Sequence, residues 1–200
     1  MIGKGKSISH GVAALEYDLA KEINGQAVAT EIARHELYGC TGAEMVQEMK
    51  PYHIDFPNVK NNCLRFEVSP SIEESATFTD ADWAELGNDF MQRMGLANHQ
   101  YIIIRHSGTE SKKEQAHLHI LANRVSLSGE LYRDNWIGKK ATEAANAIAK
   151  DRNFVQSQDI GKVNKAEIKE AMDGVLKQMQ GFDFTKFKEE LGKRGFKVRE

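Results

Sequence analysis

The pattern of apolar and polar residues along the chain predicts short strands and helices that alternate. Apolar runs rich in β-branched and aromatic residues predict four strands, at residues 29–38, 63–69, 101–106 and 117–125. Three helices are predicted where Ser9, Thr41 and Thr79 precede stretches of helical periodicity, the first reaching about Glu22 and the third Gly95. Further helices follow at 138–153, 165–180 and 184–193, and a last short strand at 196–198. This order of elements predicts an α+β sandwich, with helices packed on a mainly antiparallel sheet.

The length and composition of the chain fit one catalytic domain with an appended helical piece. With 200 residues, 40% of them hydrophobic, the chain can bury the core of one full domain. It has no run of 18 apolar residues and no apolar leader, so we expect a soluble, intracellular protein. Cys40 and Cys63 are too few for a disulfide framework and are expected to be reduced thiols. A formal net charge of -2 argues against a broad basic surface, so a nucleic-acid site would have to be a local patch.

Three of the seven histidines lie close together, around a polar loop between two predicted strands. Because side chains alternate along a strand, His117 and His119 face the same side, about 7 Å apart. If the loop from Ser107 to Ala116 makes the two strands antiparallel neighbours, His106 reaches the same point. Three imidazoles in this arrangement would bind a divalent metal and leave coordination positions open for a substrate oxygen. The metal stays open among Mn, Mg, Ni, Zn and others, although imidazole suits Mg least. The alternative is a pair of surface histidines on an edge strand.

Tyr17 is the strongest candidate for a nucleophile among the five tyrosines. Tyrosine suits a reaction that breaks and later reseals a phosphodiester, since its phenolate both attacks phosphorus and leaves again. The apolar stripe of the first predicted helix is formed by Val12, Leu15, Leu19 and Ile23. Tyr17 points away from that stripe and shares its face with His10, Ala14 and Lys21, whose charge could favour a phenolate or hold a phosphate. A surface tyrosine packed against a neighbouring helix is the alternative, and Tyr132 is the next candidate nucleophile.

Three segments carry a family resemblance: the start GKGKSISHGVAALEY, the segment LRFEVSPS, and the core from HQYIIIRH to HLHILANRV. Together they resemble the MobA-like relaxase and mobilization nuclease domain of the HUH endonuclease superfamily, especially the short mobilization proteins of Bacteroides-type elements. The most specific part is a tyrosine helix followed by a histidine and a His-x-His strand pair that ends in Asn-Arg. The resemblance implies a two-layer sandwich with a five-stranded antiparallel sheet over residues 1–155. A helix-rich C-terminal extension over residues 156–200 would follow, and its last element suggests a truncation.

The resemblance also implies an activity. The protein would be a DNA relaxase, a metal-dependent endonuclease that nicks one strand at an origin of transfer for plasmid or transposon mobilization. His106, His117 and His119 would hold the metal, and Tyr17 would form a 5'-phosphotyrosine link and release a 3'-hydroxyl. The implied partners are single-stranded origin DNA, accessory mobilization proteins and a coupling protein of the transfer system. We expect a monomer in the bacterial cytoplasm, without membrane insertion.

Two positions depart from the pattern of this family, which often carries H-x-D ahead of H-x-H-x-H. Gly108 and Gln115 stand where the acidic residue and the additional histidine would be. We therefore expect Glu67 to orient a metal ligand, with a solvent-facing glutamate as the alternative. Asn123 shares the face of His119 and could also reach the site. DNA contacts are expected from Lys4, Lys6, Lys21, Arg105 and Arg124, with Arg133, Lys139 and Lys140 as further candidates.

Three other functions stay open on the residues alone. A rolling-circle replication initiator or single-strand transposase would use the same chemistry, but such proteins usually place the tyrosine after the His-x-His pair, whereas Tyr17 precedes it. A non-catalytic, metal-stabilised DNA-binding module would not depend on Tyr17. A metal-dependent hydrolase would release free products without a covalent protein–DNA species.

Overall fold

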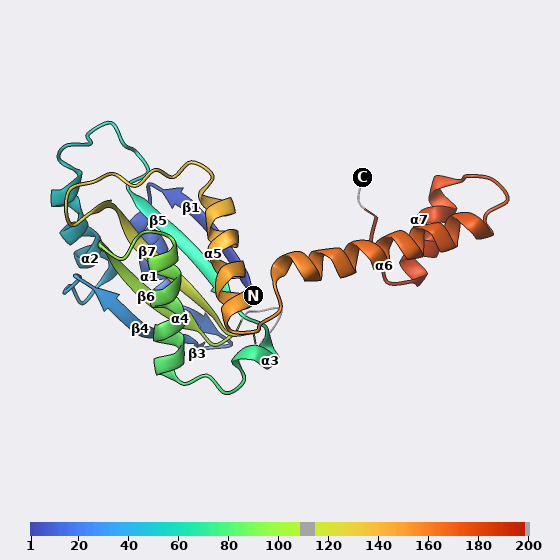
Figure 1. Ribbon diagram of the computed structural model, residues 1–200, viewed down its shortest axis with the longest axis horizontal. Helices are drawn as coiled ribbons and strands as arrows, with labels where there is room; N and C mark the ends of the chain where they lie inside the picture. Colours follow the sequence, from blue (N-terminus) through green and yellow to red (C-terminus); the bar gives the residue numbers. More distant parts are fainter. Residues whose placement is uncertain (109–114, 199–200) are drawn as a thin grey trace. The chain divides into compact units, whose positions relative to one another are not determined.

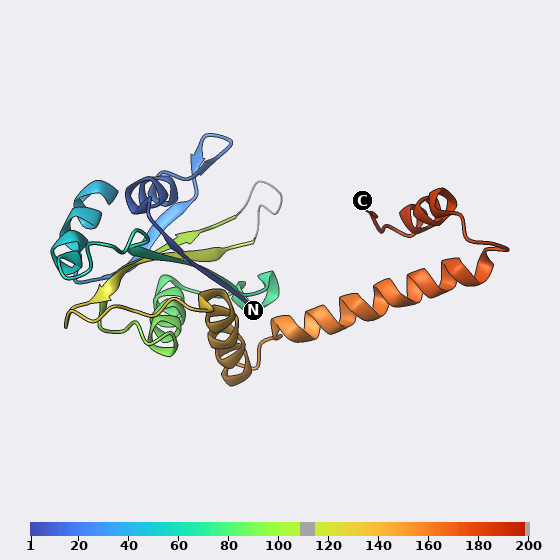
Figure 2. The same cartoon turned by 90° about the horizontal axis from the view of Figure 1, so that it is seen from above.

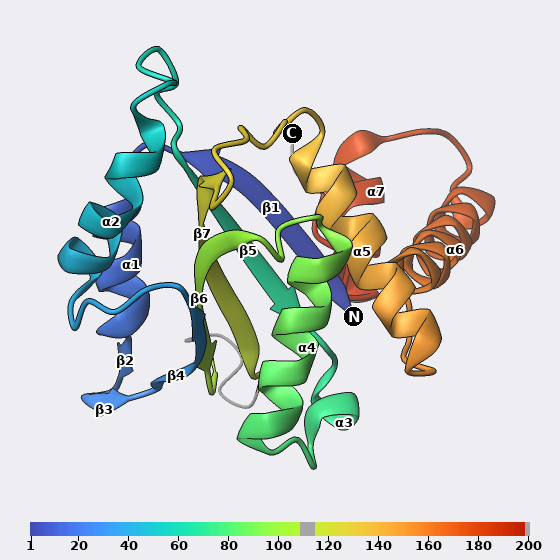
Figure 3. The ribbon, with the colours of Figure 1, turned by 60° about the vertical axis from the view of Figure 1, so that its left-hand side comes forward.

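The computed structural model describes residues 1–108 and 115–198, and the chain divides into two compact units, residues 1–156 and 157–200 (Figure 1). The first unit is built on a five-stranded sheet of order β1-β5-β7-β6-β4, in which every neighbouring pair is antiparallel (Figure 3). The strands are β1 (Ile2–Ile8), β4 (Ala29–His35), β5 (Cys63–Ser69), β6 (His99–His106) and β7 (His117–Ser126). A separate hairpin is formed by β2 (Glu22–Ile23) and β3 (Gln26–Ala27). The predicted antiparallel sheet is confirmed.

Helices lie on both faces of this sheet (Figure 2). The helices of the first unit are α1 (Gly11–Leu19), α2 (Gly42–Met49), the 3-10 helix η1 (Lys50–His53), α3 (Ile72–Ser75), α4 (Asp80–Arg93) and α5 (Ile137–Asp151). α4 and α5 cover one face, and α1 and α2 cover part of the other. Alternate strand residues fill the two cores, so that Phe66 and Ile103 pack toward α4 and α5, while Ile102 and Leu121 pack toward α1 and α2.

Strand β1 is absent from the sequence-based prediction, and its residues explain why. The strand alternates small and basic residues and has little of the β-branched and aromatic content that marks a strand. Gly3 and Gly5 lie beneath α5, where a Cβ atom would collide with neighbouring atoms. Lys4 and Lys6 project from the opposite face, because side chains alternate along a strand. Pairing with β5 along the whole strand and the close approach of α5 make this segment a strand.

The predicted helix starts have different outcomes. Thr41 and Thr79 each form a capping box with the residue three positions on, so these two signals are confirmed. The predicted cap at Ser9 is wrong. Helix α1 begins at Gly11, the N-cap residue is His10, and its side chain makes no capping hydrogen bond. The helix also ends before the predicted Glu22, and the chain turns there into the β2–β3 hairpin.

The second unit is a pair of helices, α6 (Ser157–Gln178) and α7 (Phe184–Lys193). Ala171 and Val175 of α6 pack against Phe187 and Leu191 of α7. The helix-rich C-terminal part is therefore confirmed, although α6 begins well before its predicted start. The predicted strand at 196–198 is wrong, since its apolar side chains pack on the helix pair instead of pairing with another strand. Within the part of the chain that the structure describes, no helix is long and apolar enough to cross a membrane.

Candidate active site

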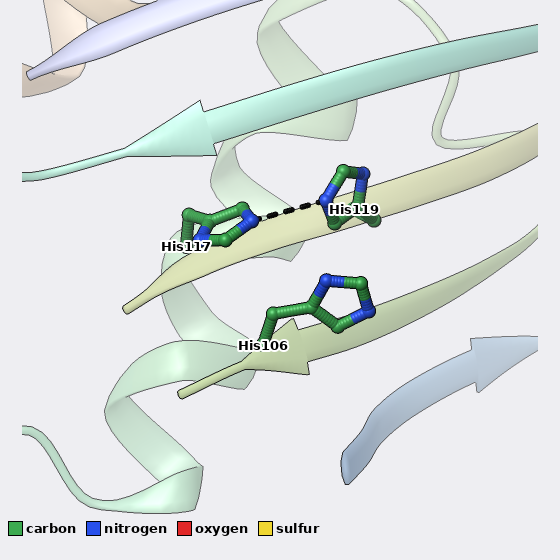
Figure 4. A group of neighbouring side chains, drawn as sticks. All are labelled: His106, His117 and His119. Carbon is green, nitrogen blue, oxygen red and sulfur yellow. Dashed lines mark hydrogen bonds between the residues drawn. The ribbon is translucent and has the colours of Figure 1, made fainter. Parts of the chain in front are cut away.

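Three histidines of the neighbouring strands β6 and β7 gather at one end of the sheet (Figure 4). His106, the last residue of β6, lies opposite His117, the first residue of β7, and His119 follows on the same face. One ring nitrogen of each lies within 4.8 Å of the other two. The structure thus brings the three predicted side chains together, through the antiparallel pairing expected for these strands. Residues 109–114 of the connecting loop lie outside the described residues.

Each histidine has one ring nitrogen next to a neighbouring protein group. Nε2 of His106 lies 2.7 Å from the main-chain oxygen of Asp18, and Nδ1 of His117 lies 3.1 Å from the main-chain oxygen two residues before it. Nδ1 of His119 lies 3.3 Å from Nη2 of Arg65, whereas its Nε2 is 3.1 Å from Nε2 of His117. In His106 and His117, the ring N–H that donates to a protein oxygen sets the tautomer and leaves the other nitrogen for a metal. In His119, Nδ1 accepts from Arg65 instead. The donor set therefore fits a bound metal ion.

Burial keeps two of these imidazoles uncharged at neutral pH. Removal from water lowers the pKa of His119 to about 2, and the neighbouring histidines, Arg65 and Lys4 act in the same direction. Burial also lowers the pKa of His106, against the opposing effect of its hydrogen bond to Asp18. Neutral imidazole is the form that binds a divalent metal. Three such ligands leave coordination positions open, as in catalytic sites rather than closed structural ones.

Tyr17 lies on α1, next in sequence to a residue that contacts the histidines. Tyr17 is 56% exposed, and it faces away from the core beneath the helix, as predicted. Nζ of Lys21 donates to the Tyr17 hydroxyl at 2.6 Å and lies 4.8 Å from the ring centre. The charge of Lys21 also lowers the pKa of His106. Ala14, predicted on the same face as Tyr17, is instead buried in the core, because α2 packs against that side of α1.

Asp18 is a site residue that the sequence pattern did not identify. It is 1% exposed and forms a two-bond ion pair with Arg65 of β5, in which Nε of Arg65 donates to Oδ2 at 3.0 Å. Oδ1 of Asp18 lies 3.7 Å from Nδ1 of His119, and its main-chain oxygen accepts from His106. The available signal was its spacing, three residues after Leu15, which puts Asp18 beside the buried stripe of the helix.

Glu67 and Asn123 have surroundings that differ from the prediction. Glu67 lies opposite His119 across the β5–β7 pair, but its carboxylate accepts a hydrogen bond from Lys4 at 2.9 Å. Asn123 is fully buried, four residues along β7 from His119, a distance of about 13 Å by strand rise. Its side chain lies 2.7 Å from Nε2 of His53 and donates to the main chain at the end of α2. Asn123 therefore anchors the η1 segment and lies apart from the three histidines.

Basic side chains gather on one side of the histidines. Lys4 and Lys6 of β1 and Arg65 of β5 line a pocket of about 210 Å³, together with Glu67 and His119. Gly5 and Phe66 complete its lining. Among the described residues Lys6 forms no ion pair, whereas Lys4 is paired with Glu67 of the same pocket. Lys4 and Lys6, two of the predicted DNA contacts, thus lie in one pocket with His119.

Two other predicted DNA contacts lie elsewhere. Arg105 pairs with Asp80 at the start of α4, on the opposite face of the sheet from the histidines. Arg124 donates to the carboxylate of Asp134 at 2.6 Å and to two main-chain oxygens, so it fastens the chain between β7 and α5. Side chains alternate between the two faces of a strand, and both arginines occupy positions that face away from the histidine side of the sheet. The further candidates lie around the start of α5 and are Arg133, Lys139 and Lys140.

Comparison with known proteins identifies the family of the chain. The family model for relaxases, described as the MobA/VirD2-like nuclease domain, matches residues 17–154. The chain belongs to this family. The match begins at Tyr17 and includes all three histidines, so the relaxase domain contains both halves of the candidate site. The resemblance that the sequence suggested is confirmed.

Solved structures with a similar course of the chain include two of the conjugative relaxase TrwC in complex with OriT DNA. The metal-free structure shares 10% identity at a TM-score of 0.46 and covers 80% of this relaxase chain and 70% of that chain. The metal-bound structure shares 12% identity at a TM-score of 0.43, with coverage of 80% and 71%. A search of curated proteins finds no significant match.

Proposed function

We propose that this relaxase domain nicks one strand of DNA at an origin of transfer, through transesterification by Tyr17, in the mobilization of a plasmid or transposon. The observation that carries the proposal is the hydrogen bond between His106 and the main-chain oxygen of Asp18, because it seats the tyrosine helix on the histidine cluster. A nucleophile on that helix and a metal held by the three histidines would act on the same phosphodiester. Membership of the relaxase family supports this reaction class.

The proposed bond changes balance at phosphorus. The phenol of Tyr17 loses its proton and its oxygen bonds to phosphorus, while the bond between phosphorus and the 3'-oxygen breaks. The 3'-oxygen takes up a proton and leaves as a hydroxyl, and the 5' end stays linked to the enzyme as a phosphotyrosine. A divalent metal on His106, His117 and His119 would neutralise charge that develops on a non-bridging oxygen. Mn, Mg, Ni, Zn and similar ions are all candidates for that role.

Lys21 is placed to assist the attack. Its ammonium donates to the Tyr17 hydroxyl at 2.6 Å, and this hydrogen bond strengthens when the oxygen becomes negatively charged. The phosphotyrosine link keeps the energy of the broken phosphodiester, so a later attack by a hydroxyl can reseal the strand without ATP. Lys21 thus has a role in the proposed reaction beyond contact with DNA.

Phosphates next to the scissile bond would bind in the pocket beside His119, where Lys4, Lys6 and Arg65 gather. The change Lys6→Ala should weaken binding of a single-stranded oligonucleotide and reduce the salt slope of the binding constant by about 0.7. Arg105→Ala is the matched control, because Arg105 pairs with Asp80 on the other face of the sheet. Equal losses in the two variants would place the DNA strand elsewhere.

The proposal assigns the chemistry to residues 1–155 and leaves residues 156–200 as a helical extension. The proposed partners are single-stranded DNA of the origin, accessory mobilization proteins and a coupling protein of the transfer system. The domain would act as a monomer in the bacterial cytoplasm, because the histidines and Tyr17 come from one chain and need no second copy to meet.

The decisive test is covalent transfer. Single-stranded oligonucleotides tiled across the DNA around the gene are incubated with Mn²⁺ and protein, and covalent products are separated on a denaturing gel. We expect a protein–DNA band with the wild type and none with Tyr17→Phe. Tyr38→Phe is the matched control, because Tyr38 is 77% exposed and its hydroxyl bonds to Glu36. This variant should keep the band.

Other outcomes would assign another role. A band that survives Tyr17→Phe would move the nucleophile to another tyrosine, with Tyr132 first. That assignment would be unexpected, because Tyr132 packs edge-on against His99. His99 lies seven residues before His106 on the same strand, which is about 23 Å by strand rise. Cleavage without a covalent band would indicate a hydrolase. DNA binding without cleavage would indicate a metal-stabilised binding module, and activity on replication or transposon-end sequences would indicate an initiator or transposase.

A further inference from the structure

Asp18, on the tyrosine helix α1, lies beside two of the three histidines. Its main-chain oxygen lies 2.7 Å from Nε2 of His106, and its carboxylate lies 3.7 Å from Nδ1 of His119. The side chain is almost fully buried, where an unpaired carboxylate would be strongly disfavoured. Arg65 compensates that charge through two hydrogen bonds from β5. Tyr17, immediately before Asp18, is thereby tied to the same framework.

The pair of charges meets one side of the His119 ring. Nη2 of Arg65 lies 3.3 Å from Nδ1 of His119, and Oδ1 of Asp18 lies 3.7 Å from the same nitrogen. The other nitrogen, Nε2, faces Nε2 of His117 at 3.1 Å. Because a guanidinium can only donate, Nδ1 of His119 accepts from Arg65 in this arrangement. A metal on Nε2 would require the hydrogen of the ring to lie on Nδ1 instead, and Oδ1 of Asp18 is the acceptor available to it there. Without the Asp18 carboxylate, the charge of Arg65 would be uncompensated. It would then repel a metal ion bound to the His119 ring.

We propose that the Asp18–Arg65 ion pair is a positioning device that couples the seat of the tyrosine helix to the metal site. Through its carboxylate, Asp18 orients His119 and neutralises Arg65; through its main-chain oxygen, it orients His106. Metal binding and the docking of α1 then stabilise each other, because both depend on the same contacts. The inference rests on the proposed function for the roles of the metal and of Tyr17.

The surroundings of the other nearby carboxylate support this assignment. Glu67 is directed to Lys4 at 2.9 Å, and 37% of its side chain is exposed, compared with 2% for Asp18. Gly108 stands at the loop position where the resembled family often has an acidic residue. The orienting carboxylate therefore comes from the nucleophile's own helix. A displacement of α1 would therefore disturb the metal ligands and the tyrosine together.

The test measures metal binding without DNA. Mn²⁺ is titrated into the metal-free full chain by calorimetry, for the wild type and for Asp18→Asn, Asp80→Asn and Tyr17→Phe. Loss of a residue that orients a metal ligand typically costs 10- to 100-fold in metal affinity, and we expect a loss in this range for Asp18→Asn. Asp80→Asn is the matched control, since it removes an aspartate paired with an arginine on the other face of the sheet. Asp80→Asn and Tyr17→Phe should stay within about twofold of the wild type.

A double variant separates orientation from charge. Asp18→Asn combined with Arg65→Gln removes the cation that the single variant leaves beside His119. Its Mn²⁺ affinity should lie between those of Asp18→Asn and the wild type, because repulsion is relieved while orientation stays lost. Equal Mn²⁺ affinity in Asp18→Asn and Asp80→Asn would overturn the proposal.

A second measurement needs only the wild type, and so holds even if Asp18→Asn fails to fold. Amide hydrogen exchange is compared with and without Mn²⁺, with α4 as the internal control because it lies on the opposite face of the sheet. Mn²⁺ should increase protection in α1 and leave α4 unchanged; no change in α1 would refute the coupling. Covalent transfer is not involved in either measurement. Failure of the nicking reaction by a chain that binds Mn²⁺ would therefore contradict the proposed function and not this inference.

Discussion

A methyl group added at Gly3 should destabilise the first unit, because α5 packs directly on strand β1 at this position. A Cβ atom there would lie 2.4 Å from the main-chain oxygen of Ala141 and 2.6 Å from Cβ of Ala145. The oxygen belongs to a helix backbone, so β1 or α5 would have to move by roughly 0.6 Å or more. Overpacking of this kind costs about 1–3 kcal/mol, and the lower entropy of the unfolded alanine chain offsets about 0.4–1 kcal/mol of that. The free energy of unfolding should fall by about 1–2 kcal/mol for Gly3→Ala.

Urea denaturation followed by tryptophan fluorescence measures this change, since both tryptophans, Trp83 and Trp136, lie in the first unit. Gly138→Ala is the matched control at the same contact between β1 and α5. Its Cβ would lie 3.5 Å from the main-chain oxygen of Gly5, an ordinary contact distance, so stability should stay within about 0.5 kcal/mol or rise. Wild-type stability in Gly3→Ala, or equal losses in the two variants, would refute the argument from close packing.

Two further predictions follow from buried titratable groups. Burial lowers the pKa of His99, His106 and His119 below the ordinary 6.5, so below that pH the unfolded chain binds more protons than the folded one. Stability of the metal-free chain should be complete above pH 6.5 and fall by up to about 1.4 kcal/mol per pH unit per histidine below it; a urea midpoint unchanged from pH 7.5 to 5.5 would contradict this. Burial raises the pKa of the Cys63 thiol to about 11, whereas Cys40 is exposed. A thiol reagent at pH 8 should therefore modify Cys40 alone in the native protein and both cysteines in urea.

Local sequence patterns were sufficient to predict most elements and the grouping of the three histidines. Strands with apolar alternation and helices with Thr41 and Thr79 as caps depend on neighbouring residues, so they can be recognised without the fold. The same holds for His117 and His119, because the period of a strand puts both on one face. The same alternation puts Arg105 on the face opposite His106, where it pairs with Asp80. Strand alternation alone therefore separates this arginine from the histidines.

Other features depend on residues far apart in the chain. β1 carries glycine and lysine where a strand usually carries branched side chains, and it becomes a strand because β5 pairs with it and α5 packs on it. Asp18 is charged, and its burial is possible because Arg65 approaches from another strand. Asn123 has the direction expected of a site residue, but His53 and the end of α2 occupy the space beside it.

Short-range spacing along the chain is therefore enough to predict the strand and helix periods, the family and the shared face of the histidine pair. Tertiary contacts are needed to tell which carboxylate lies beside the histidines, where Lys4 and Lys6 lie, and which arginines form ion pairs within the fold. The physical reason is that a charged side chain takes its direction and burial from its partners. Those partners are brought to it by strand pairing and helix packing across the whole domain.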